Sequence, residues 1–199
     1  MPVPESGAAA WGRSLAAAVL LAVLPGAWAQ QPAPARLALC AACHGEGGNS
    51  QIPQFPSLAG QPQQFIENQL VLIREGLRDI PQMKGMLDGV KDDELVILGK
   101  YFSQQVPAAA KTRAEPGAYQ RGLQLSQKML CGTCHLPDYS GRQQIPRLAG
   151  QHEPFLLESM KQFRDHPGLG RDTVMAAALF GLKDPELADL AHFLTHFKP

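Results

Sequence analysis

The chain has 199 residues, and its 18 basic and 18 acidic side chains give a formal net charge of zero. This length allows one large domain or two small ones, and the balanced charge argues against nucleic acid as a partner. Only 7% of the residues are aromatic, while 19 are glycine and 17 are proline. This composition indicates a loop-rich fold in which a prosthetic group fills part of the apolar core.

The N-terminus has the pattern of a cleaved secretory signal peptide, predicted over residues 1–29. Arg13 supplies the positive charge, Leu15 to Leu24 form an uncharged apolar run, and Ala27-Trp28-Ala29 fits the cleavage site. A retained anchor is the alternative, but the run is shorter than the roughly 20 residues that span a bilayer. We therefore expect a mature protein that starts at Gln30 and is exported to the bacterial periplasm.

The motif Cys-x-x-Cys-His occurs twice and contains all four cysteines of the chain. It is the attachment signature of c-type haem, because thiols at positions i and i+3 share one helix face and the next histidine can reach the iron. A redox disulfide or a zinc site is the alternative for an isolated Cys-x-x-Cys. We predict two covalent haem c groups, held by Cys40, Cys43, Cys131 and Cys134, with His44 and His135 as iron ligands.

The sequence that follows each motif is repeated. Pro56-Ser-Leu-Ala-Gly-Gln61 matches Pro146-Arg-Leu-Ala-Gly-Gln151, and Cys40 and Cys131 are 91 residues apart. A fixed offset of this kind is the mark of a duplicated unit. We predict an N-terminal domain over residues 30–106, a proline-bounded linker over 107–116 and a C-terminal domain over 117–199.

Each domain is predicted to be all-α, since no segment alternates as a strand does. A short helix leads into each motif, best defined over residues 117–130. The other helices are expected near residues 63–75, 91–104, 153–165 and 184–197, with a methionine-bearing loop before the last helix of each domain.

The second axial ligand is predicted to be a methionine. Met83 lies seven residues before Val90, and Met175 lies seven residues before Leu182. A thioether ligand raises the reduction potential, as in cytochromes with His/Met ligation. This register selects Met83 and Met175; Met86 and His166 are the alternatives, while Met129 and Met160 are expected in the core.

Other residues are expected to support the sites. The carbonyls of Pro56 and Pro146 are suitable acceptors for the second N–H of the ligand histidines. Arginines at matched positions either bind haem propionates or lie on solvated helix faces; they are Arg74, Arg78, Arg164 and Arg171. The remaining histidines are expected at the surface or at helix ends; they are His152, His166, His192 and His196.

With these motifs the chain resembles the dihaem cytochrome c4 family. The resemblance rests on the tandem Cys-x-x-Cys-His, the two Leu-Ala-Gly-Gln loops and the two methionine segments, and it runs from about Leu37 to Phe197. It implies two class I cytochrome c domains related by a pseudo-twofold axis, which carry electrons in the periplasm, often towards a terminal oxidase. One departure is Leu136, which follows His135 where glycine follows His44.

Two six-coordinate irons leave no open position, so we expect an electron-transfer protein and not an enzyme. It would shuttle single electrons from a cytochrome complex or dehydrogenase towards a terminal oxidase, with peripheral membrane association allowed. The alternatives are a dedicated haem subunit of a periplasmic dehydrogenase or oxidase, and a dihaem peroxidase. Residues 30–106 carry 6 basic and 8 acidic side chains, net −2, and residues 117–199 carry 9 and 8, net +1. The two domains are therefore expected to prefer different partners.

Overall fold

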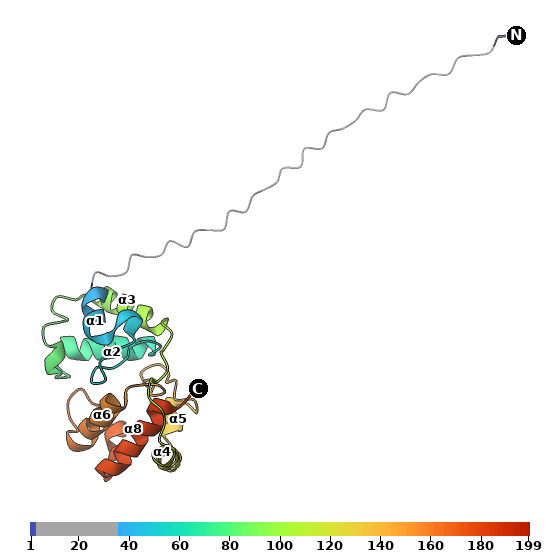
Figure 1. Cartoon of the computed structure of the whole chain (residues 1–199). Helices are drawn as coiled ribbons and strands as arrows, with labels where there is room; N and C mark the ends of the chain where they lie inside the picture. Colours follow the sequence, from blue (N-terminus) through green and yellow to red (C-terminus); the bar gives the residue numbers. More distant parts are fainter. Residues whose placement is uncertain (3–35) are drawn as a thin grey trace. The chain divides into compact units, whose positions relative to one another are not determined.

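The computed structural model describes residues 1–2 and 36–199 (Figure 1). The predicted cleavage site at Ala27-Trp28-Ala29, the mature start at Gln30 and nearly all of the predicted signal peptide lie outside these residues. Within the described residues, no helix combines the length and hydropathy needed to cross a membrane.

The described residues form helices joined by loops, which confirms the predicted all-α class; their only bridge is an isolated one between Arg142 and Ile145. The first half contains α1 (Leu37–His44), η1 (Glu46–Gly48), α2 (Gln63–Arg74), η2 (Pro81–Met83) and α3 (Asp92–Ser103). The second half contains α4 (Pro116–Lys128), α5 (Cys131–His135), α6 (Glu153–Asp165), α7 (Thr173–Leu179) and α8 (Asp184–His196). Figure 1 shows the first set in blue to green and the second in yellow to red.

The helix predicted over residues 117–130 differs from the structure at both ends. Pro116, assigned to the linker by sequence, is the first residue of α4, where its missing N–H costs no hydrogen bond. Leu130 has a left-handed backbone with φ of 57°, which separates α4 from the short α5 that carries the second motif. In the first half α1 carries its motif without a break.

The core of the second half is one continuous apolar cluster. Helices α4 and α8 meet at Gly122, where an added Cβ would lie 2.1 Å from the carbonyl oxygen of Asp189, so the two backbones touch. Phe193 on α8 is fully buried and packs edge-on against Tyr139, whose hydroxyl is bonded to Ser126 at 2.8 Å.

The core of the first half is divided into two smaller clusters, one around Leu98 and Phe102 and one around Leu87 and Leu95. The two halves also differ at one position of the repeat that is buried in the second half. The carbonyl of Gly48 accepts the N–H groups of residues 58 and 59, as the carbonyl of Tyr139 accepts those of residues 148 and 149. Glycine therefore stands in the first half where the second half buries a tyrosine.

The two halves are joined by a reciprocal set of hydrogen bonds within the one unit that contains residues 36–199. The side chain of Gln61 donates to the Arg147 carbonyl at 2.9 Å and accepts the Arg147 N–H at 2.9 Å. The side chain of Gln151 does the same with Ser57, at 2.8 and 2.9 Å. Since Gln61 matches Gln151 and Ser57 matches Arg147 in the repeat, these contacts follow a pseudo-twofold relation.

Replacing either glutamine should loosen this contact. Gln61→Ala or Gln151→Ala removes two hydrogen bonds and leaves half-buried backbone groups unpaired, so we expect the free energy of unfolding to fall by about 2–4 kcal/mol. Urea unfolding followed by circular dichroism measures the change. Gln144→Ala, at an exposed glutamine of the same region, is the control. Equal midpoints for Q61A, Q151A and Q144A would contradict the prediction.

Candidate haem-binding sites

In the first half, α1 brings Cys40, Cys43 and His44 onto one turn of helix. His44 is 8% exposed as a residue, and its Nδ1 donates a hydrogen bond of 2.8 Å to the carbonyl of Pro56. This bond fixes the ring and leaves Nε2 as the nitrogen available to a metal. Burial lowers the pKa of His44, an effect that the bond to Pro56 partly offsets, so the ring is neutral and able to act as a ligand at pH 7.

The second half repeats this arrangement. The His135 residue is 7% exposed and its Nδ1 donates to the carbonyl of Pro146 at 2.9 Å. Burial again lowers the pKa of the imidazole. The predicted acceptor role of the two proline carbonyls is thus confirmed in both halves.

No disulfide joins the four cysteines, and three of them are half-buried while Cys134 is exposed. Burial raises the pKa of Cys40 and of Cys131 above the usual value of a thiol. The donor set fits haem c, with two thiols for the porphyrin edge and one fixed imidazole for the iron.

The residue after each ligand histidine has the same unusual backbone. Gly45 has φ of 76° and ψ of 162°, and Leu136 has φ of 70° and ψ of 156°. This region is open to glycine and strained for other residues, at a cost of order 1–3 kcal/mol. The departure from the repeat at Leu136 therefore leaves the course of the chain unchanged and adds strain beside the second motif.

Leu136→Gly should relieve this strain. We expect the free energy of unfolding to rise by about 1 kcal/mol, the strain relief less the greater chain entropy of glycine. Gly45→Ala is the opposite change and should destabilise the first half, because its Cβ would lie 2.0 Å from the Asn49 carbonyl oxygen. Thermal unfolding of the holoprotein measures both. A lower midpoint for L136G would mean that the packing of Leu136 outweighs its strain.

The two methionines predicted as iron ligands lie in different secondary structure. Met83 ends η2, as a loop position would. Met175, expected in a loop, lies instead in the first turn of α7, because the Asp172 carboxylate accepts its N–H at 2.8 Å and caps that helix. Both methionines are half-buried, whereas Met160 is 5% exposed in the core, as predicted.

Two arginines fix the register of the methionine segments. Arg74 donates to the carbonyl of Val90 at 2.9 Å, and Arg164 donates to the carbonyl of Leu182 at 2.9 Å. The same guanidinium groups pair with Asp92 and Asp184, both at 2.8 Å. Val90 and Leu182 are therefore structural equivalents, and each follows its predicted methionine ligand by seven residues.

The equivalence of Val90 and Leu182 allows Met86 to be compared with its counterpart in the second half, and the same contacts define what Arg74 and Arg164 bind. The position that matches Met86 in the second half is Ala178, so Met86 has no methionine counterpart. Arg74 and Arg164 are engaged by carbonyls and carboxylates of their own halves. These contacts give both guanidinium groups a structural role that neither sequence-based interpretation of the pair included.

Three of the four other histidines lie at helix ends, as expected: His152 and His166 flank α6, and His196 ends α8. His152 also reaches across to the first half, where its Nε2 donates to the carbonyl of Ser50 at 3.0 Å. The prediction is wrong for His192, which lies inside α8 and is half-buried.

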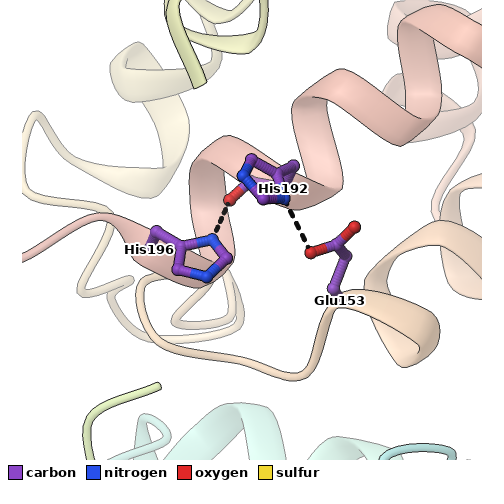
Figure 2. Close-up of side chains that lie close together, drawn as sticks. All are labelled: Glu153, His192 and His196. Atoms are coloured by element: carbon purple, nitrogen blue, oxygen red, sulfur yellow. Dashed lines mark hydrogen bonds and ion pairs between the residues drawn. The ribbon is translucent and has the colours of Figure 1, made fainter. Parts of the chain in front are cut away.

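His192 belongs to a cluster with Glu153 and His196 that has the residue types of a metal site (Figure 2). The ring of His192 donates to Glu153 at 2.9 Å and accepts the Glu115 N–H at 2.8 Å. The ring of His196 donates to the His192 carbonyl at 2.8 Å and is bonded to the Thr112 hydroxyl at 2.9 Å. Since every ring nitrogen has a partner, the cluster attaches residues 112–115 to α6 and α8. Only the spacing of four between the histidines signalled it in the sequence.

An all-α chain with two such motifs and two carbonyl-held histidines defines a c-type cytochrome. A family model described as Cytochrome c matches residues 119–198. Cytochrome c4 of Azotobacter vinelandii is 32% identical over 177 residues, covering 80% of this chain and 84% of that protein. The chain belongs to the cytochrome c4 family.

A solved structure and a further relative agree with this assignment. The crystal structure of reduced recombinant cytochrome c4 from Pseudomonas stutzeri matches with a TM-score of 0.76 and 29% identity, covering 82% of this chain and 95% of that one. The thiosulfate dehydrogenase electron acceptor of Thiomonas intermedia is 31% identical, covering 77% of this chain and 76% of that protein. The chain is thus an electron-carrying c-type cytochrome with covalently bound haem c and two tandem cytochrome c-like halves.

Proposed function

We propose that the protein carries two haem c groups and passes single electrons between redox proteins of the periplasm. One haem is attached through Cys40 and Cys43 within residues 30–106, and the other through Cys131 and Cys134 within residues 117–199. The observation that carries the proposal is the pair of buried, neutral histidines, each with Nδ1 held by a proline carbonyl and Nε2 left for iron.

His44 with Met83 would hold one haem iron, and His135 with Met175 would hold the other. Haem c supplies a one-electron Fe(III)/Fe(II) couple when it is bound, and a thioether ligand raises its potential. The chain holds these ligands in place through the proline carbonyls on one side. On the other side Arg74 and Arg164 fasten the segment after each methionine to the preceding helix. Ligands held in this way would favour electron transfer over chemistry at the iron.

The proposed route runs from a cytochrome complex or a dehydrogenase towards a terminal oxidase, with the chain as a free carrier. The net charges of −2 and +1 on the two halves support different partners for each. A second function is favoured by the Thiomonas relative, whose name describes an electron acceptor for thiosulfate dehydrogenase. By that analogy the chain would serve a periplasmic dehydrogenase as its haem subunit.

Purification of the native protein under low salt distinguishes these functions. A free carrier should elute as the haem-containing chain alone and should exchange electrons rapidly with a small c-type cytochrome, at a rate that falls as salt screens the charges. A dehydrogenase that co-purifies in constant stoichiometry would favour the haem subunit. Turnover of hydrogen peroxide by the resting protein would overturn the electron-carrier proposal in favour of a peroxidase.

A further inference from the structure

Arg78 and Arg171 are matched residues whose charges have no carboxylate partner. Each is half-buried, and each donates to the side-chain oxygen of a glutamine nine residues earlier, Gln69 and Gln162. Among residues 36–199, no ion pair includes either guanidinium group. This sets them apart from Arg74 and Arg164, which pair with acidic residues of their own halves.

The two arginines lie where the halves meet. Gly170 packs against the backbone of Leu77, since a Cβ added at Gly170 would lie 2.3 Å from the Leu77 carbonyl oxygen and 3.0 Å from the Cα of Arg78. Each arginine directly follows one of these two contacting residues. Burial and the facing charge of Arg171 lower the pKa of Arg78 to about 10, so Arg78 still carries its charge at pH 7.

Two partly desolvated like charges without a counter-charge are unfavourable, and an anion that reaches both would stabilise them. The guanidinium fork binds carboxylates in particular, through paired N–H groups. Haem c carries propionate carboxylates on the porphyrin edge opposite its thioether bonds. In the sequence the arginines precede Met83 and Met175 by five and four residues, so they lie in the segments that lead to the proposed iron ligands.

We propose that Arg78 and Arg171 form one shared cationic site at the contact between the halves, and that this site binds propionate carboxylates of both haems. The inference rests on the proposed two-haem function. A positive charge near a haem favours Fe(II), because the reduced centre carries one positive charge fewer. A shared site therefore makes the potential of each haem depend on both arginines, and this dependence links the two potentials.

Spectroelectrochemical titration of holoprotein variants tests the shared site. Arg78→Gln and Arg171→Gln should each lower the Fe(II)/Fe(III) ratio of both haems at a fixed potential by about tenfold, equivalent to about 59 mV for a one-electron couple. Arg113→Gln, at an exposed arginine outside this contact, should change neither haem. Arg78→Lys keeps the charge and should restore most of the shift, which a purely structural role would not allow.

Three results would contradict the proposed shared site. The first is unchanged reduction potentials in R78Q and R171Q, and the second is a potential shift confined to one haem in each variant. The third is an equal potential shift in R78K and R78Q. If R78Q does not retain both haems, R171Q carries the same test from the other half. A haem count of two in the unsubstituted protein separates failure of this site from failure of the proposed function.

Discussion

Met83→His is expected to lower the reduction potential of one haem by roughly 0.1–0.3 V, a fraction of the ~0.8 V range that axial ligands cover. The same variant should remove the sulfur-to-iron charge-transfer band from that haem only. The reason is that a thioether favours Fe(II), whereas imidazole is the stronger donor and stabilises Fe(III). Met175→His should have the same effect on the other haem. Optical redox titration measures both changes.

Met86→His is the matched control, because Met86 lies three residues further along the same segment. Its carbonyl accepts the Arg36 guanidinium at 2.9 Å, a backbone contact that the substitution leaves in place. The variant should keep both charge-transfer bands. If M83H keeps both bands and M86H loses one, Met86 is the iron ligand, and the spacing of Met83 from Val90 does not identify it.

Removing the thiols of one motif is expected to remove one haem. Cys40→Ser/Cys43→Ser and Cys131→Ser/Cys134→Ser should each halve the haem absorbance per chain, measured as the alkaline pyridine complex. The first double variant should also lose more helix than the second, because the apolar core of the first half is two small clusters. The second half has one continuous cluster that includes Tyr139.

Circular dichroism of the two double variants compares their helix content, and the protein with all four cysteines is the reference. Equal losses would mean that the haem contributes equally to both cores despite the difference between Gly48 and Tyr139. Retention of two haems by either double variant would contradict the assignment of the motif it lacks.

Local sequence signals predicted the elements that local chemistry determines. The range expected near residues 153–165 is the observed α6, and α2 and α3 end within a residue of the predicted ranges. Helix α7 was not predicted. Its cap depends on the Asp172 side chain, and its seven residues are too few for a clear periodicity. The positive φ angles of Leu130 and Leu136 could not be predicted from the sequence, because leucine rarely adopts a positive φ.

The sequence repeat matched residues of the two halves but did not reveal the role of each matched residue. The two Leu-Ala-Gly-Gln loops end in glutamines that bond to the opposite half, which only the tertiary structure reveals. The four matched arginines likewise could not be separated by sequence. Arg74 and Arg164 bind acidic side chains and carbonyls in the folded protein. Arg78 and Arg171 instead follow the contacting residues Leu77 and Gly170, and neither forms an ion pair with a described residue.

A spectroelectrochemical titration of the native holoprotein tests the central claim most directly. Two haems per chain, both low-spin and both with a sulfur-to-iron charge-transfer band, are predicted to titrate as two one-electron steps. A single haem per chain, or a haem that is high-spin in the resting protein, would contradict the account.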